Sequence, residues 1–506
     1  WVSPIFRNKW IHNWRGQPSA SYHGYWITDF TDVDPHFGTK ADFKRLVDAA
    51  HARGMKVYLD IVVNHTADVI RYRECPHAPC AYRSEAEYPY DRKGGVDGPP
   101  INQGFLGDDA AHQTDANFAR LVSPDYAYTP YIPAGEAHIK KPDWLNDVRL
   151  YHNRGDMADA DQQETKTHGD FGGLDDVMTE NPRVVRGFIA VYERWIADFG
   201  VDGFRIDTER HVDPAFWRAF CPAILKFARA HGKPNFYIFG EVADPDPAML
   251  ARHTRVDKLP AVLDFAFQAA ALDAIGGKTG TTRLARLFDA DPDYVGGAAG
   301  AMQMATFIGN HDMGRFPDLL RARSPNMSRD ELLKRTVLAD ALLLFSRGAP
   351  IIYYGQEQGL YGGGGDNEAR QTMFPSQVAA YQAETPLGAT RPGAPGYNEQ
   401  APIYRAIAEM TTLRNAHPGL RRGVQVVALT RHKPGLYVFT RTDPKDGQYL
   451  IALNTSTEPQ VAYAPVDIGR TGWTSLHGAC APRSAAPGSL RVEVPALGYI
   501  VCRAAS

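Results

Sequence analysis

Short apolar runs alternate with amphipathic helical patterns along the chain up to about residue 420. Thr39 precedes apolar residues spaced three and four apart, which predicts a capped helix. The run 55–63 that follows is apolar almost throughout, as in parallel strands buried on both faces. A second helix is predicted at 182–199, and Gly200 separates it from the strand at 201–206.

The remaining strand candidates continue this alternation. They are residues 1–6, 236–239, 261–267, 302–308 and 350–354. Strands separated by helices indicate βαβ units and a parallel sheet. Seven strands are counted in this way, so we expect a (β/α)₈ TIM barrel whose first βα unit and true N-terminus precede Trp1.

Two segments depart from the alternation. Residues 66–173 are rich in Pro, Gly, Tyr and Asp and are far longer than a βα loop, which predicts a subdomain inserted after the third barrel strand. Beyond residue 420, short β runs between Gly, Pro and Asp turns predict a C-terminal antiparallel β-sandwich. These runs are 424–429, 436–441, 449–453, 461–464 and 490–502. The expected domains are a barrel (1–65 and 174–420), an inserted domain (66–173) and a sandwich (421–506).

The composition narrows the classes of ligand. Hydrophobic residues make up 44% and charged residues 22%, and no run approaches the ~18 apolar residues of a membrane span. The net charge is −3 and no Lys/Arg block occurs, so we expect no nucleic-acid partner and no membrane partner. The expectation is a monomer that acts on a neutral molecule.

The five cysteines predict two disulfides. Cys75 and Cys80 lie close together in a loop-like stretch, and Cys480 and Cys502 bracket the terminal strands, which leaves Cys221 as a buried thiol. Cys75 and Cys80 could instead be half of a zinc site, although no second pair or His cluster accompanies them. The disulfides slightly favour a secreted or periplasmic protein, and the sequence leaves its location unknown.

Polar residues recur where the predicted strands end, which in a parallel barrel is the face on which active sites are built. They include Asp207, Glu241 and Asp312. Arg205 lies two residues before Asp207, so both side chains point the same way and the guanidinium would keep Asp207 ionised. Glu241 follows an aromatic strand, so we expect apolar surroundings and the role of a proton donor. A single acid at a strand end could equally be a structural cap or part of an ion pair.

Several of these segments resemble signature motifs of the α-amylase family of glycoside hydrolases. They are Asp60-Ile61-Val62-Val63-Asn64-His65, Gly203-Phe204-Arg205-Ile206-Asp207 with Arg210-His211, Gly240-Glu241-Val242 and Asn310-His311-Asp312, together with Tyr22-His23-Gly24-Tyr25-Trp26 and Leu174-Asp175-Asp176. The resemblance extends from Trp1 to about residue 420, and the terminal sandwich is similar to the family's C domain.

The resemblance assigns catalytic roles. It implies that Asp207 is the nucleophile, Glu241 the general acid/base and Asp312 the stabiliser of the transition state, in a reaction that needs two carboxyl groups about 5 Å apart. It also implies that Arg205 orients the nucleophile.

Further roles follow for residues that hold the substrate. His65 and His311 would hydrogen-bond the glucose at the cleaved position, with Tyr25 stacked beneath it and Trp26 nearby. Arg210 and His211 are expected to bind substrate as well. Arg210 stands where amylases commonly have Lys, so the contacts on the leaving-group side of the cleaved bond are expected to differ. Gly309, before Asn310, is smaller than the residue usual there.

A possible calcium site is also implied by the resemblance, formed by Asn64, Asp176 and the backbone of His211, and no organic cofactor is expected. The expected activity is hydrolysis of α-1,4 glucosidic bonds in starch-like α-glucans or maltooligosaccharides. Hydrolysis of α-1,6 bonds is a further candidate. A transglycosylase of the same family is the alternative. A catalytically inactive binding homologue is disfavoured because all three carboxylates are present.

Overall fold

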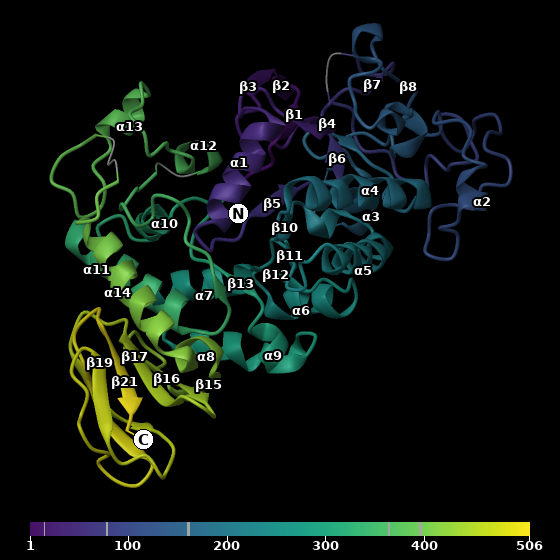
Figure 1. The fold of residues 1–506 in the computed structure, drawn as a ribbon. Coiled ribbons are helices and arrows are strands. Elements are labelled where there is room, and N and C mark those ends of the chain that lie inside the picture. Colours follow the sequence, from purple (N-terminus) through teal and green to yellow (C-terminus); the bar gives the residue numbers. More distant parts are fainter. Residues whose placement is uncertain (15, 77–78, 159–161, 363–364, 394–396, 506) are drawn as a thin grey trace. The chain divides into compact units, whose positions relative to one another are not determined.

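The computed structural model describes residues 1–506 except 15, 77–78, 159–161, 363–364, 394–396 and 506 (Figure 1). The chain forms two compact units. The first comprises Trp1–Val242 and His253–Val262, and the second comprises Ala243–Arg252 and Leu263–Ser506.

Parallel strands run through the first unit as predicted. In order of pairing they are β5 (Tyr58–Ile61), β10 (Gly203–Ile206), β11 (Tyr237–Gly240) and the first half of β12 (Ala261–Asp264). Of the strand expected at residues 1–6, Val2 forms an isolated parallel bridge with Leu59 of β5, and Phe6 begins β1 (Phe6–Asn8), which pairs antiparallel with β4 (Ile27–Val33). All residues of β10 are buried, and its one charged side chain, Arg205, is paired with carboxylates.

The second unit continues with the end of β12, β13 (Ala305–Thr306) and β14 (Ala349–Pro350), again parallel. These strands are shorter than predicted. The strand expected at 261–267 ends at Asp264, because the Asp264 carboxylate accepts a hydrogen bond from the Phe267 amide at 2.8 Å and starts helix α7 (Phe265–Ile275). Residues 302–304 and 351–354, also expected to be strand, lie outside β13 and β14.

Helices follow the strands in both units. In the first unit they include α1 (Lys40–His51), α4 (Pro182–Phe199) and α5 (Pro214–Ala230), while α6 (Pro247–Arg255) has residues in both. The second unit contains α7, α8 (Thr282–Asp289), α9 (Gly297–Ala301), α10 (Phe316–Arg323), α11 (Arg329–Phe345) and α14 (Pro402–Ala416). Thr39 and Asp42 form the capping box of α1, and Gly200 ends α4 with a φ of 71°, as both sequence signals predict.

An aromatic cluster forms part of the core of the first unit. Phe188, Tyr192 and Trp195 on the buried side of α4 pack against Phe6 of β1 (Phe6–Asn8) and Phe30 of β4 (Ile27–Val33). The Phe6 and Trp195 rings meet edge to face at 5.0 Å. Burial of these rings holds α4 against the strands that precede the site.

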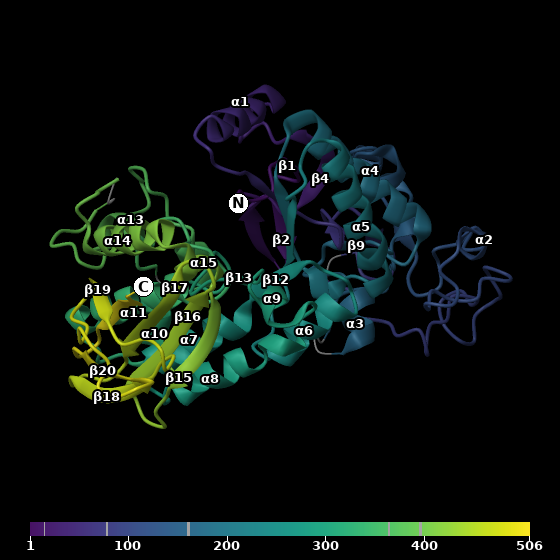
Figure 2. The ribbon, with the colours of Figure 1, turned by 60° about the horizontal axis from the view of Figure 1, so that its bottom comes forward.

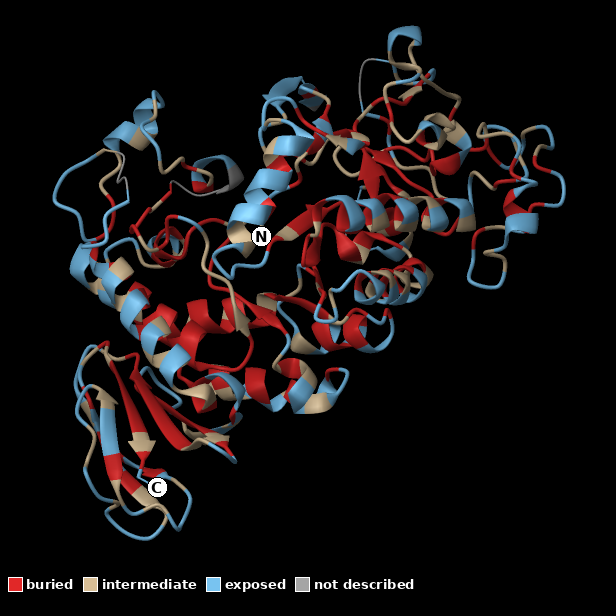
Figure 3. Cartoon of the chain, in the orientation of Figure 1, coloured by how far each residue is buried: buried red, intermediate tan, exposed pale blue. Residues whose placement is uncertain are grey.

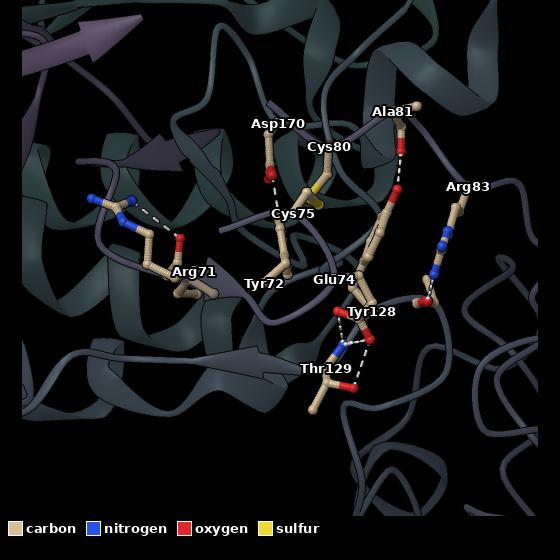
Figure 4. The surroundings of a disulfide bond; sticks show 12 residues. Arg71, Tyr72, Glu74, Cys75, Cys80, Ala81, Arg83, Tyr128, Thr129 and Asp170 are labelled. Atoms are coloured by element: carbon tan, nitrogen blue, oxygen red, sulfur yellow. Dashed lines mark hydrogen bonds between the residues drawn. A yellow bond between two sulfur atoms is a disulfide. The ribbon is translucent and has the colours of Figure 1, made fainter. Parts of the chain in front are cut away.

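The segment expected to be an inserted subdomain has few regular elements. They are β6 (His65–Thr66), β7 (Arg71–Tyr72), α2 (Asp115–Phe118), β8 (Pro130–Tyr131), three 3₁₀ turns (Ala134–Glu136, Asp143–Asn146, Val148–Leu150), α3 (Gln163–His168) and, just after it, β9 (Asp175–Asp176). Cys75 and Cys80 form a disulfide, so the zinc alternative is wrong. Figure 4 shows Glu74 beside it, where its carboxylate accepts hydrogen bonds from the Thr129 amide at 3.0 Å and hydroxyl at 2.8 Å.

The C-terminal part of the second unit is antiparallel, as predicted. One sheet has the order β15 (Val424–Leu429), β16 (Leu436–Asp443), β17 (Gly447–Asn454), β21 (Tyr499–Ala504) and β19 (Trp473–His477), and β18 (Gln460–Pro465) pairs with β20 (Ser489–Val494). Cys480 and Cys502 form the second expected disulfide, and Cys221 is a buried thiol. Helix α15 (Pro418–Arg422) packs on β16 and β17 (Figure 2).

Two details of this region were predicted wrongly. The run 490–502 is two strands, because Leu497 adopts a left-handed φ of 51° and the chain turns between β20 and β21. Strand β19 was not predicted. Among the described residues no helix is long and apolar enough to cross a membrane.

Candidate active site

Asp207 and Glu241 directly follow two neighbouring parallel strands of the first unit. Ile206 at the end of β10 is in register with Gly240 at the end of β11. The Glu241 amide donates to the Ile206 carbonyl at 2.8 Å, and the Asp207 amide donates to the Ile61 carbonyl at 2.9 Å. The backbone ladder therefore extends to both acids and fixes their positions.

Arg205 joins the two carboxylates. Its fully buried guanidinium donates from Nη1 to Asp207 Oδ1 at 2.7 Å, and its Nη2 pairs with Glu241 Oε1 at 2.8 Å. Glu241 Oε2 accepts a hydrogen bond from the Thr208 amide at 3.2 Å. The contact expected between Arg205 and Asp207 is present. The apolar surroundings expected for Glu241 are absent, because the Arg205 guanidinium and the Thr208 amide contact its carboxylate.

Asp60 is a third carboxylate in contact with Arg205, and sequence reasoning gave it no role. Arg205 Nη1 donates to Asp60 Oδ1 at 2.9 Å, and Asp60 Oδ2 accepts from Trp1 Nε1 at 2.9 Å and from the Tyr25 hydroxyl at 3.0 Å. Burial raises the pKa of Asp60 to about 6, and Arg205 opposes that rise. The pKa of Arg205 is raised well above its usual value because these carboxylates outweigh the effect of burial.

Tyr25 and Trp26 lie next to this network. The Tyr25 ring is stacked on His23, with ring centroids 5.5 Å apart, and Trp26 meets His23 edge-on at 4.5 Å. Since the Tyr25 hydroxyl is held by Asp60, the orientation of the Tyr25 ring is tied to the carboxylate cluster. The structure thus brings together Asp207, Glu241, Arg205 and Tyr25 from the predicted set.

His65 and His211 have a common neighbour in Phe171. His65 is stacked with Phe171 at 6.2 Å, and His211 meets Phe171 edge-on at 5.1 Å. Burial lowers the pKa of His65 to about 3 and that of His211 to about 4, so both imidazoles are neutral at pH 7. The His65 imidazole hydrogen-bonds the Tyr25 backbone, and this bond opposes the fall in its pKa. Arg210 lies half-buried in the 3₁₀ turn Glu209–His211.

Asp312 and His311 belong to the second unit, after β13. The Asn310 side-chain oxygen accepts hydrogen bonds from the amides of Asp312 at 3.0 Å and Met313 at 2.9 Å, which fixes the turn. Asp312 pairs with His311 at 3.1 Å and with Arg370 at 3.0 Å. No sequence signal pointed to Arg370, which lies 58 residues from Asp312.

The same turn explains the small residue before Asn310. A Cβ added to Gly309 would lie 2.8 Å from the Gly314 carbonyl oxygen and 3.0 Å from the Phe316 amide nitrogen. Glycine is therefore the residue that fits this close approach of two backbone segments.

Asn64 and Asp176 lie side by side because β6 pairs with β9, and the Val177 amide donates to the Asn64 carbonyl at 2.9 Å. Burial raises the pKa of Asp176 to about 7. Asp176 Oδ2 is 2.6 Å from His152 Nδ1, whereas Asp176 Oδ1 is buried without a partner among the described residues. His152 also contacts Glu180 at 3.1 Å, a neighbour that the sequence did not indicate.

Two groups of side chains within the described residues have the spacing of metal ligands. They are Asp108, His152 and His168, and Glu209, His253 and Asp257. In the second group, His253 Nδ1 lies 3.0 Å from Glu209 and 2.6 Å from Asp257, so a charged imidazole pairs with both acids. The pKa of His253 is raised to about 9 because these two carboxylates outweigh burial.

Comparison with known proteins places the chain in a family. Residues 1–423 match the family model described as alpha amylase, catalytic domain. The chain is 43% identical over its full length to an alpha-amylase of Streptomyces lividans, of which it spans 54%. A cyclomaltodextrin glucanotransferase of Niallia circulans is 26% identical over 78% of this chain and 46% of its own length. The chain thus spans about half the length of these curated relatives.

Solved structures agree on the fold. An α-amylase from Geobacillus thermoleovorans, complexed with acarbose, matches with a TM-score of 0.69 at 24% identity and covers 100% of this chain and 88% of that chain. The predicted fold class, a TIM barrel with a C-terminal antiparallel β domain, is therefore confirmed. Because the family model covers residues 1–423 and the Streptomyces lividans relative matches the whole chain, this chain belongs to the α-amylase family of glycoside hydrolases.

Proposed function

We propose that this chain is a retaining glycoside hydrolase that cleaves α-1,4 glucosidic bonds in starch-like glucans or maltooligosaccharides, with α-1,6 bonds as further candidates. The observation that carries the proposal is the pair Asp207 and Glu241, which follow adjacent strands and contact one buried guanidinium. Two carboxyl groups on neighbouring strand ends suit a double displacement, in which one attacks and the other transfers protons.

In the proposed reaction, Asp207 attacks the anomeric carbon while Glu241 protonates the departing glycosidic oxygen. Glu241 then removes a proton from water, which attacks the same carbon and releases Asp207 from the glycosyl ester. Arg205 holds the attacking oxygen in place and keeps Asp207 ionised between turnovers. Asp312 would bind hydroxyls of the distorted sugar ring and favour its positive charge.

Substrate contacts are proposed for the aromatic and imidazole side chains around this pair. The hydrogen bond between the His65 imidazole and the Tyr25 backbone supports a role for His65 at the sugar ring on which Tyr25 would stack. Tyr25 would stack on the ring at the cleaved position, with Trp26 behind it. Roles for Arg210, His211 and His311 rest on the family motifs.

Calcium, which members of this family commonly bind, fits the residues present. Asp176 offers a buried carboxylate oxygen without a partner, and the adjacent Asn64 is buried as well. We propose that Asn64, Asp176 and the His211 carbonyl would hold the ion. Bound there, it would supply positive charge that ties the segment after β5 to the segment after β10.

The same proposal divides the chain into a barrel (1–65 and 174–420), an inserted domain (66–173) and a C-terminal domain (421–506), and treats the protein as a monomer. Size-exclusion chromatography with light scattering tests the last point. A mass of about 112 kDa, twice the 55.9 kDa of the chain, would contradict it.

A transglycosylase is the second candidate, since glucanotransferases occur among the relatives. Chromatography of products formed from amylose, pullulan, β-cyclodextrin and maltotriose separates the two. Shorter linear products from amylose support hydrolysis, whereas cyclic products or chains longer than the substrate support transfer. Absence of any product from all four substrates would overturn both proposals.

A further inference from the structure

Phe374 and Tyr397 are large aromatic side chains that the fold leaves in solvent. Phe374 is 62% exposed and Tyr397 is 69% exposed, and their rings meet edge to face with centroids 6.0 Å apart. They lie in the segment after β14 that contains helix α13 (Ala379–Ala383), none of whose residues is buried (Figure 3). Each exposed ring leaves apolar surface in water, so core packing does not account for the pair.

The backbone near these rings is held by a network of hydrogen bonds. Arg315 Nε donates to Gln371 Oε1 at 2.6 Å, and Gln371 in turn donates to Glu384. Glu384 also accepts hydrogen bonds from the amides of Tyr361 at 2.6 Å and Gly362 at 3.2 Å. Since Arg315 and Gln371 are buried, this network gives the exposed segment a defined conformation.

Both rings lie near a backbone amide that donates to a side chain. Phe374 follows Gln371 by three residues, and its amide donates to Thr372 Oγ1 at 3.1 Å. Tyr397 precedes Asn398, whose amide donates to Gln358 Oε1 at 2.9 Å. A residue held by such a hydrogen bond therefore lies within two positions of each ring in the chain.

The hollow beside Phe374 has the lining of a sugar site. A space of about 210 Å³ is bordered by Phe374 and Tyr381, by the polar residues Gln371, Thr372, Gln382 and Glu384, and by apolar residues that include Leu360, Pro375 and Pro386. Aromatic faces next to amide, hydroxyl and carboxylate groups match a pyranose, whose C–H faces stack on rings while its hydroxyls form hydrogen bonds.

The segment is also tied to a predicted catalytic residue. Arg370 Nη2 donates to Asp312 Oδ1 at 3.0 Å, and Phe374 lies four residues further along the chain. Four residues of extended chain span at most about 14 Å, so the backbone of Phe374 lies within that distance of the backbone of Arg370. A glucan bound at Asp312 and continuing along this segment would meet the aromatic pair.

We propose that Phe374 and Tyr397 form a stacking platform for a glucose unit of a long α-glucan, outside the positions that flank the cleaved bond. The inference rests on the proposed function. It makes the platform a determinant of chain-length preference, because a short substrate ends before it and a long one gains the stacking contact.

The test compares wild type with Phe374→Ala, Tyr397→Ala and the double variant on amylose and on maltotriose. Tyr463→Ala is the matched control, since Tyr463 on β18 is 60% exposed. The double variant should lose about tenfold in kcat/KM on amylose, equal to about 1.4 kcal/mol, mainly through KM, with maltotriose unchanged within about twofold. Tyr397→Phe and Phe374→Trp should keep wild-type kinetics because they keep the rings.

Affinity electrophoresis in gels that contain amylose measures binding without turnover. Wild type and Tyr463→Ala should be retarded, and the double variant should be retarded less, as expected for about tenfold weaker binding with an intact active site. Equal retardation of the double variant and wild type would overturn the platform, as would equal loss of activity on amylose and maltotriose. A wild type that is retarded but cleaves no glucan would contradict the proposed function and leave the platform supported.

Discussion

Asp340 offers a sharp test of how a buried carboxyl group limits the stability of this fold. It lies fully buried on α11, where its Oδ1 accepts a hydrogen bond from Gln356 and its Oδ2 has no partner within the described residues. Burial raises the pKa of Asp340 to about 8, and the hydrogen bond from Gln356 opposes that rise. The perturbation is Asp340→Asn, which keeps the acceptor oxygen and removes the titration.

The sign follows from proton binding. An unfolded Asp has a pKa of about 3.9, so between pH 4 and pH 8 the folded state holds a proton that the unfolded state has released. The contribution of Asp340 to the free energy of unfolding is fully present below pH 4. It is lost as the pH rises to 8, at up to about 1.4 kcal/mol per pH unit. Over about four units the loss is at most about 5 kcal/mol.

Thermal unfolding of wild type and Asp340→Asn at pH 5, 6, 7 and 8 measures this effect. The difference in Tm should be small at pH 5 and should grow in favour of the variant up to pH 8. Asp330→Asn, a change at an exposed carboxylate paired with Lys334 on the same helix, serves as a control without such growth. A Tm difference for Asp340→Asn that stays constant from pH 5 to pH 8 would refute the reasoning.

Four further predictions concern the site and the C-terminal domain. Asp207→Asn or Glu241→Gln should lower kcat about 10⁴-fold with an unchanged circular dichroism spectrum, and a variant retaining a tenth of the rate would contradict its role. Asp60→Asn should lower kcat/KM about 10²-fold by loosening Arg205, and unchanged kinetics would show that Asp60 positions nothing. Proton NMR in the first minutes of maltooligosaccharide cleavage should show the α-anomer first, and the β-anomer would exclude a double displacement. Replacing Cys480 and Cys502 with Ser should lower the free energy of unfolding by about 3 kcal/mol, and an unchanged Tm would show that this disulfide does not stabilise the fold.

Local signals in the sequence predicted most of the fold because their physical causes are local. The capping box at Thr39 and the left-handed Gly200 each satisfy backbone groups within one turn, so they can be recognised without a structure. The strand at 261–267 was overextended because the apolar pattern of 265–267 suits a buried helix as well as a strand. Only the cap formed by Asp264 separates the two possibilities.

The site was predictable where its residues share a strand end and not where they meet through the fold. Arg205 and Asp207 are two residues apart, so strand periodicity alone places them together. The contacts of Trp1 and Arg205 with Asp60 join residues 59 and 145 positions apart, and that of Arg370 with Asp312 joins residues 58 apart. No periodicity relates such positions, which explains why the contacts of Asp60 and Arg370 were not predicted.

The charges around Arg205 suggest a reason for burying several carboxyl groups beside one guanidinium, an arrangement that is costly in desolvation. Arg205 contacts Asp60, Asp207 and Glu241, and when Glu241 carries the proton that it donates in the proposed reaction, two carboxylates still share one buried cation. Burial already raises the pKa of Asp60 to about 6, so this site holds more negative charge than its surroundings favour. A neutral glucoside does not offset this negative charge. The oxocarbenium-like transition state of the proposed reaction brings a positive charge, which the carboxylates stabilise more than they stabilise the substrate. The excess of carboxylates would thus lower the barrier through an interaction that is strongest in the transition state.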